Sequence, residues 1–181
     1  MLHFRKATEN DINGIEQIYS EIHDYEEQGL LTTGWKRGIY PTRETAEAGV
    51  KRQDMYIAEL DHQLIAAAVI NQEQLDSYKD VNWKSDAPDD EVMVLHTLVL
   101  SPKFFGQGLG TAFVLFFEQL AFTENCRYLR LDTNARNEKA RSLYKRFGYT
   151  EAGIVPCTFQ GLENIQLVLL EKELNMHCAG M

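Results

Sequence analysis

The pattern of hydrophobic and polar positions predicts alternating helices and strands along the first half of the chain. Ile12, Ile15, Tyr19 and Ile22 recur with helical spacing, which predicts a helix with one apolar face. Two later runs rich in β-forming residues are separated only by Asp61-His62-Gln63, which is typical of a hairpin. The elements expected in this half are a strand over 2–6, a helix that begins near 12, a helix over 41–52, and strands over 55–60 and 64–70.

The second half continues the alternation, and its clearest strand spans 92–100 and ends at Ser101-Pro102. Nine of the fourteen residues from Thr111 to Glu124 are apolar, so the helix expected there should be buried against a sheet. The polar stretch over 75–91 ends in an acidic run, either a solvated loop or a rim that attracts a cationic substrate. The other elements expected are a helix over 109–124, a strand over 128–132, a helix over 137–147 ended by Gly148, strands over 150–158 and 164–172, and a frayed tail from 175.

Composition and charge narrow the class of protein. The chain has 181 residues, 44% of them hydrophobic, as in one ordinary globular domain. The longest apolar run, Leu64 to Ile70, is short, and the first residues lack the apolar core of a secretion signal, so we expect a cytoplasmic protein that does not enter a membrane. The net charge of −9 opposes nucleic acid as a partner and mildly favours a cationic acceptor such as an amine, although solubility alone would also explain it. Cys126, Cys157 and Cys178 lack metal-ligand spacing, so we expect reduced thiols and no metal.

The segment from Leu98 to Thr111 carries the most informative motif. A strand ends at a proline, a glycine-rich turn over 105–110 follows, and a helix begins. Backbone N–H groups at a helix start lack partners, the helix dipole adds positive charge, and glycines let a ligand approach the backbone closely. The segment is therefore expected to bind an anion such as a pyrophosphate.

A dinucleotide-binding Rossmann unit is an alternative with the same order of strand, turn and helix. Asp132 lies 22 residues after Gly110 and resembles the acidic residue that such a unit uses. The glycine spacing does not fit, because the third glycine counted from Gly106 would fall on Thr111. A nicotinamide-dependent oxidoreductase therefore stays as the minor alternative.

The arrangement instead resembles the GNAT superfamily of acyl-CoA N-acyltransferases. The family's phosphate loop reads Arg/Gln-x-x-Gly-x-Gly/Ala after a strand that ends in x-Pro, and residues 105–110 match that frame with Pro102 in place. Phe105 departs from the frame, because it stands where the family has Arg or Gln. Backbone amides can still bind phosphate, so we expect binding of the acyl donor to survive, at the same or a lower affinity, with Lys103 as a candidate for the missing charge.

A second stretch, Asn137 to Tyr149, is similar to the family's signature N-x-x-A-x-x-L-Y-x-x-x-G-F/Y. Asn137, Ala140 and Tyr144 have the spacing of residues that share one face of a helix. That face is either a core face with a partly buried tyrosine or, as the resemblance implies, a wall along the CoA arm with Tyr144 near the thioester sulfur. The two motifs follow the family's order, and the resemblance covers about residues 2–173.

The resemblance implies one α/β domain over 1–174, with a mixed central sheet of about six to seven strands flanked by about four helices, and a tail over 175–181. It implies acetyl-CoA as cosubstrate and an amine of a small molecule or a protein as acceptor, and it leaves a homodimer open. The residues expected to bind the cofactor are Leu98, Val99, Leu100, Phe105, Gly106, Gln107, Gly108, Leu109, Gly110, Thr111, Asn137, Ala140 and Tyr144.

The resemblance also implies a direct attack of a neutral amine on the thioester carbonyl. Tyr144 is the expected acid for the leaving thiolate, and backbone N–H groups over 98–100 are expected to stabilise the oxyanion. His96 is the first candidate for the base, because an imidazole titrates near neutral pH and strand alternation places it on one face with Val94 and Leu98. A histidine satisfied within the sheet is the alternative, and Glu91 or water is then the base.

The acceptor side carries little sequence signal. The resemblance implies that residues 29–40 cover the acceptor. Glu26, Trp35 and Tyr40 are candidates to recognise an amine through charge and cation–π contact, although ordinary loop packing explains them as well. A protein that binds acyl-CoA as a sensor without turnover is the alternative from a different functional class.

Overall fold

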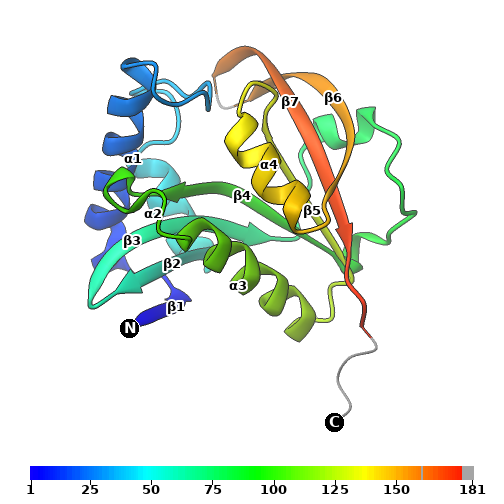
Figure 1. Ribbon diagram of the computed structural model, residues 1–181, viewed down its shortest axis with the longest axis horizontal. Coiled ribbons are helices and arrows are strands. Elements are labelled where there is room, and N and C mark those ends of the chain that lie inside the picture. Colours follow the sequence, from blue (N-terminus) through cyan, green and yellow to red (C-terminus); the bar gives the residue numbers. More distant parts are fainter. Residues whose placement is uncertain (160, 177–181) are drawn as a thin grey trace.

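A mixed sheet of seven strands forms the centre of the fold in the computed structural model, which describes residues 1–159 and 161–176 (Figure 1). The order across the sheet is β1-β2-β3-β4-β5-β7-β6. Neighbouring strands are antiparallel, except that β4 and β5 are parallel. Their bounds are β1 Leu2–Lys6, β2 Met55–Leu60, β3 Gln63–Asn71, β4 Val92–Leu100, β5 Tyr128–Asn134, β6 Thr150–Phe159 and β7 Leu162–Glu173.

Helices cover both faces of the sheet, α1 and α2 on one side and α3 and α4 on the other (Figure 1). Their bounds are α1 Ile12–Glu27, α2 Arg43–Arg52, α3 Leu109–Thr123 and α4 Glu138–Arg146. The apolar face predicted from Ile12 to Ile22 is buried against β2 and β3. On the other side, α3 buries Phe113 and Phe117 in the core and leaves Leu115 51% exposed, so its predicted burial holds for one face.

The segment between β3 and β4 packs more closely than its polar sequence predicts. It contains two short 3-10 turns, η2 (Asp76–Asp80) and η3 (Asp89–Glu91). Tyr78 is buried and Trp83 is half-buried, and both pack against the sheet beside Val92. The acidic run from about residue 86 is largely solvated, as one of the two expectations had it, and so are the side chains of Asp76 and Lys79.

The predicted elements are present, and the expected α/β architecture is confirmed. The largest difference in the second half is β7, which begins two residues before and ends one residue after the predicted strand, and β5 continues to Asn134, two residues beyond its predicted end. Cys126 and Cys157 are free thiols. Cys178 and most of the predicted tail, residues 177–181, lie outside the described residues. Within the described part, no helix has the length and apolar character needed to cross a bilayer.

The sheet also excludes the Rossmann alternative. A dinucleotide-binding unit has an open, mostly parallel sheet, with its acid at the end of a neighbouring strand. In this fold β4 and β5 are the one parallel pair among the described strands, and β7 separates β5 from β6. Asp132, the residue that resembled the Rossmann acid, lies instead in a cavity between β4 and β5.

Candidate active site

The strands β4 and β5 separate in the middle of the sheet. Their parallel pairing begins at Val92 and Tyr128 and stops at Leu95 and Leu131. Beyond that point β4 stays paired with β3, and β5 stays paired with β7. The result is a wedge in which the edge of β4 faces no neighbouring strand, so backbone groups on this edge are available to a ligand.

A bulge in β4 lies at the start of this wedge. Thr97 has a φ of 52°, which a β-branched residue rarely adopts, and the register with β3 shifts around it. The extra residue places Leu98 on the same side as Leu95, facing α3, whereas His96 stays on the side of Val94. The prediction that Val94, His96 and Leu98 share a face is therefore wrong for Leu98, which lies on the opposite face of the sheet.

The turn before α3 has the geometry expected of an anion site. Gly106 and Gly108 have φ values of 78° and 76°, a backbone conformation that favours glycine. Gly108 is the N-cap of α3, so the first N–H groups of the helix have no partner within it. The helix start can therefore bind a phosphate through its backbone.

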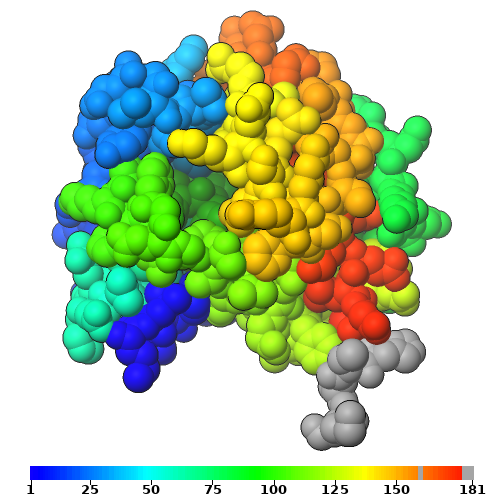
Figure 2. Space-filling view, viewed as in Figure 1, coloured from blue at the N-terminus to red at the C-terminus, as the bar shows by residue number. Residues whose placement is uncertain are grey.

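A groove of about 510 Å³ runs from this turn along β4 and α4, here called the donor groove. Figure 2 shows the surface hollowed between the green residues around the start of α3 and the yellow residues of α4. All of the predicted cofactor-binding residues line the donor groove except Gln107, whose side chain is exposed. The structure thus brings the two sequence motifs together along one surface.

Positive charge reaches the donor groove from α4. Lys103 lies elsewhere, because its ammonium pairs with Glu21 at 2.5 Å, so the expectation that it supplies the missing charge is not supported. Phe105 lines the groove, 38% exposed. Lys139 and Arg146 line it as well.

The three residues of the second motif, Asn137, Ala140 and Tyr144, all line the donor groove, and Tyr144 also belongs to the core. The Asn137 side chain also caps α4, because its Oδ1 accepts a hydrogen bond from the backbone N–H of Ala140 at 3.2 Å. Tyr144 is buried, and this desolvation, together with the nearby charge of Asp132, raises its pKa above the usual value of 10. The phenol therefore stays protonated at neutral pH.

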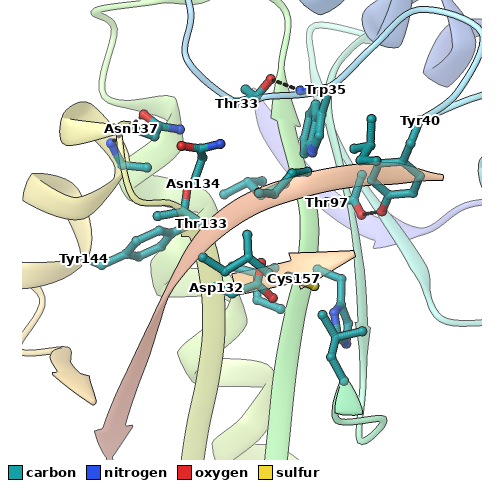
Figure 3. A pocket seen from close by; sticks show the side chains of 18 residues that line it. Thr33, Trp35, Tyr40, Thr97, Asp132, Thr133, Asn134, Asn137, Tyr144 and Cys157 are labelled. Atoms are coloured by element: carbon teal, nitrogen blue, oxygen red, sulfur yellow. Dashed lines mark hydrogen bonds between the residues drawn. The ribbon is translucent and has the colours of Figure 1, made fainter. Parts of the chain in front are cut away.

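A smaller cavity of about 110 Å³, here called the inner cavity, continues from the donor groove into the wedge (Figure 3). Residues that line both spaces are Thr33, Trp35, Leu98, Asn137, Ala140 and Tyr144. Two ligands, one in each space, would therefore meet beside Leu98 and Tyr144.

The inner cavity also continues toward α2. It shares Tyr40, Leu75, His96 and Thr97 with a third space of about 350 Å³, here called the outer cavity. The outer cavity is lined by α2 and β3, whereas the donor groove opens between α3 and α4. The two spaces thus lie beside different helices.

The loop before α2 forms one wall of the inner cavity. Trp35 and Tyr40 line it, with their rings edge to face and 5.9 Å between centroids. The Tyr40 hydroxyl is hydrogen-bonded to that of Thr97, which links the loop to the bulge in β4 (Figure 3).

Glu26 holds this loop and does not line the inner cavity. Its carboxylate accepts hydrogen bonds from the backbone N–H groups of Thr33 at 2.8 Å and Gly34 at 2.9 Å. Gly34 has a φ of 77°, and a Cβ there would lie 2.5 Å from the Asn134 amide. The positive φ favours glycine at this crossing. Because the loop's own N–H groups occupy the Glu26 carboxylate, Glu26 positions the loop and is not the expected acceptor-binding residue.

His96 lies at the junction of the inner and outer cavities. Its Nε2 is 3.0 Å from the backbone oxygen of Glu73. A carbonyl oxygen only accepts, so Nε2 carries the proton and Nδ1 is the basic atom of the neutral ring. Desolvation lowers the pKa of His96 below 6.5, partly offset by the nearby charge of Asp132, so the ring is neutral at pH 7.

Glu91, the alternative to His96 as the base, lies away from the donor groove and the inner cavity. Glu91 immediately precedes β4, seven residues before Leu98. At about 3.3 Å per residue, this separation is roughly 23 Å along the strand. Glu91 lines neither the donor groove nor the inner cavity, so it is set aside as a base.

Sequence reasoning missed a carboxyl and its partner in the inner cavity. Asp132 lines the cavity from β5, and the Tyr78 hydroxyl donates a hydrogen bond to its Oδ2 at 2.8 Å. Burial raises the pKa of Asp132. The spacing of Asp132 behind the glycine turn indicated only a possible Rossmann acid, and nothing in the sequence pointed to Tyr78.

Comparison with known proteins places these features in a family context. The chain matches the model of the Acetyltransferase (GNAT) family over residues 15–149. Relatives include the uncharacterized N-acetyltransferase MJ1207 of Methanocaldococcus jannaschii, 33% identical over 76 residues, and the uncharacterized N-acetyltransferase YesJ of Bacillus subtilis, 30% identical over 126 residues. The matches cover 42% and 69% of this chain but 34% and 64% of the relatives, so the chain spans less than two thirds of either.

Solved structures have the same fold. A GNAT-family acetyltransferase from Streptococcus agalactiae superposes with a TM-score of 0.79 at 20% identity, covering 96% of both chains. The protein yncA from Salmonella typhimurium, solved with its cofactor acetyl-CoA, superposes with a TM-score of 0.68 at 14% identity, covering 98% of this chain and 96% of that one.

Proposed function

This chain belongs to the GNAT family of acetyltransferases, and from that premise we propose that it transfers the acetyl group of acetyl-CoA to a primary amine by direct attack. The observation that carries the proposal is the junction of the donor groove with the inner cavity beside Leu98 and Tyr144. A thioester lying in the groove and an amine lying in the cavity come into contact there.

The donor groove suits acetyl-CoA in both charge and shape. The start of α3 offers backbone N–H groups to the pyrophosphate, and Lys139 and Arg146 add positive charge. The free edge of β4 beyond Leu95 can pair with the amides of the pantetheine arm as an added strand does. The structural neighbour yncA is solved with this same cofactor.

The proposed mechanism assigns each proton that moves to a residue of the site. An alkylamine with a pKa of about 10 is protonated at neutral pH, so one proton must leave before attack, and the neutral imidazole of His96 accepts it. The amine nitrogen then bonds to the thioester carbon, and the C–S bond breaks. Tyr144 gives its proton to the departing thiolate and regains one when the second proton leaves the nitrogen. N–H groups on the edge of β4 stabilise the oxyanion.

His96→Gln tests the base. Because only the neutral ring accepts a proton, and because its pKa is lowered below 6.5, kcat/KM of the unmodified enzyme should hold at pH 7 and fall at a pH below 6.5. The variant should lose that acidic limb and be about 100-fold slower at pH 7.5. His3→Gln, whose side chain is 65% exposed, is the matched control and should keep the limb. A limb that persists in His96→Gln assigns the base to another group or to water.

Phe105→Arg tests the departure from the family loop. A guanidinium at this position adds a charge-assisted contact to phosphate, so the dissociation constant of acetyl-CoA should fall about 3- to 10-fold, and this gain should shrink at high salt. Phe105→Leu keeps an apolar side chain and should show no gain. Titration calorimetry at two ionic strengths measures both variants, and an unchanged affinity for Phe105→Arg would place the phosphates beyond its reach.

The proposed function itself is tested by titration calorimetry with acetyl-CoA and with NADH as a control, followed by a thiol-release screen against an amine library. We expect micromolar binding of acetyl-CoA, none of NADH, and thiol release with at least one amine. Absence of acetyl-CoA binding would overturn the proposal. Tight binding without thiol release from any amine would favour the acyl-CoA sensor.

A further inference from the structure

Asp132 is a carboxyl group in a cavity whose walls are partly apolar and partly polar, and the transfer described above gives it no task. The apolar side chains that line this cavity include those of Leu75, Leu95, Leu98, Leu162, Ile165 and Leu167. An ionised carboxylate in such surroundings is costly unless a cation or several hydrogen bonds compensate it. The raised pKa of Asp132 reflects this cost.

The described residues compensate Asp132 only in part. The Tyr78 hydroxyl donates to Oδ2, and no other hydrogen bond to the carboxyl is made within the described part of the chain. Neither does any lysine or arginine of the described residues form an ion pair with it. Arg130, two residues earlier on β5, is instead held by Glu171 at 2.9 Å. Oδ1 is therefore left for a ligand.

Asp132 is also placed where the reaction would occur. Figure 3 shows it between Tyr144, which reaches in from α4, and Cys157 on β6, with Trp35 and Tyr40 on the side of the loop. Its charge acts on the hydroxyls of both Tyr144 and Tyr40. A group bound to Asp132 therefore lies close to the proposed acid.

We propose that Asp132 binds the ammonium group of the acceptor and thereby selects primary amines on a slim apolar chain. The inference rests on the proposed function, because it names the acceptor class of the same site. The ammonium pairs with Oδ1, and the carbon chain contacts the apolar walls. At about 110 Å³ the inner cavity is smaller than the roughly 150 Å³ that holds a benzene ring, so bulky amine heads are excluded.

The test is calorimetric titration of n-butylamine into the protein saturated with CoA, so that no reaction follows. Asp132→Asn keeps the shape of the side chain, and its carbonyl oxygen still accepts from Tyr78. We expect it to bind n-butylamine at least about 30-fold more weakly than the unmodified protein, as for other truncated buried charge pairs, with CoA affinity unchanged. Asp76→Asn removes the same charge from a side chain 97% exposed and should bind n-butylamine normally.

A second measurement needs no variant. The unmodified protein should bind n-butylamine and not butan-1-ol, which has the same chain without the charge. Equal affinity for amine and alcohol, or unchanged amine affinity in Asp132→Asn, overturns the proposal. The alcohol comparison decides the matter if Asp132→Asn does not fold.

Failure of this inference is distinguishable from failure of the proposed function. If the unmodified protein transfers acetyl groups and Asp132→Asn binds the amine normally, only the role of Asp132 in amine binding is excluded. Absence of acetyl-CoA binding by the unmodified protein would exclude the proposed function as well.

A comparison of n-butylamine with Nα-acetyl-lysine amide separates a free small amine from a protein side chain as the source of the acceptor amine. If neither compound binds, the proposal is overturned.

Discussion

Replacing Tyr144 with phenylalanine is expected to lower kcat for acetyl transfer about 100-fold and to change the dissociation constant of acetyl-CoA by less than about two-fold. Tyr144 lines both the donor groove and the inner cavity, and the proposed mechanism has the thiolate leave at this junction. Its raised pKa keeps the proton on the phenol until that step. The ring, which lines the groove, is retained in the variant, so binding should survive.

Tyr149→Phe is the matched control for this measurement. The Tyr149 ring packs edge to face on Tyr144 with 5.7 Å between centroids, but it lines neither the groove nor the cavity. Loss of its hydroxyl should therefore leave kcat close to that of the unmodified enzyme. Single-turnover kinetics with saturating acetyl-CoA separate the chemical step from product release, and an unchanged rate in Tyr144→Phe would exclude this residue as the acid.

Replacing Arg130 with methionine is expected to lower the free energy of unfolding by about 3–5 kcal/mol, because Glu171 would be left buried without its partner. The two side chains are 5% and 3% exposed and lie 2.9 Å apart. The Arg130 guanidinium also stacks on Trp83 at 4.1 Å and donates to Gln74 at 2.6 Å. Arg130 therefore links the sheet to the segment that contains Tyr78.

Denaturant unfolding measures this effect, with Lys79→Met as the control. Lys79 pairs with Asp76 on the surface, where both side chains are largely exposed, so its loss should leave stability nearly unchanged. The double variant Arg130→Met/Glu171→Leu removes both charges and should recover most of the lost stability. Equal stability of Arg130→Met and Lys79→Met would show that the buried pair contributes little.

The parts of the site that were predictable are each contained in one short segment. The glycine turn at Gly106 and Gly108 and the face of Asn137, Ala140 and Tyr144 depend on local backbone geometry, which sequence spacing reports directly. The fold followed for the same reason, since its helices and strands carry clear hydrophobic periodicity.

The remaining parts depend on contacts between distant segments or on a local break in regularity. Tyr78 and Asp132 are 54 residues apart and meet only because the segment before β4 folds onto the sheet. Glu26 looked like a ligand for an amine, but the loop's own N–H groups occupy it. The bulge at Thr97 reverses the expected alternation of side chains between the two faces of the sheet beyond His96, and no turn residue in the sequence indicates it.

The placement of the donor groove and the outer cavity beside different helices has a consequence for the order of events. A donor that enters between α3 and α4 and an acceptor that enters beneath α2 do not obstruct each other, so both can be held at once. A relay through an acetylated side chain is then unnecessary. The thiol of Cys157, which lines the inner cavity, is a poor carrier because burial raises its pKa. Steady-state rates should accordingly follow a sequential, ternary-complex law, with each product leaving by the route through which its parent entered.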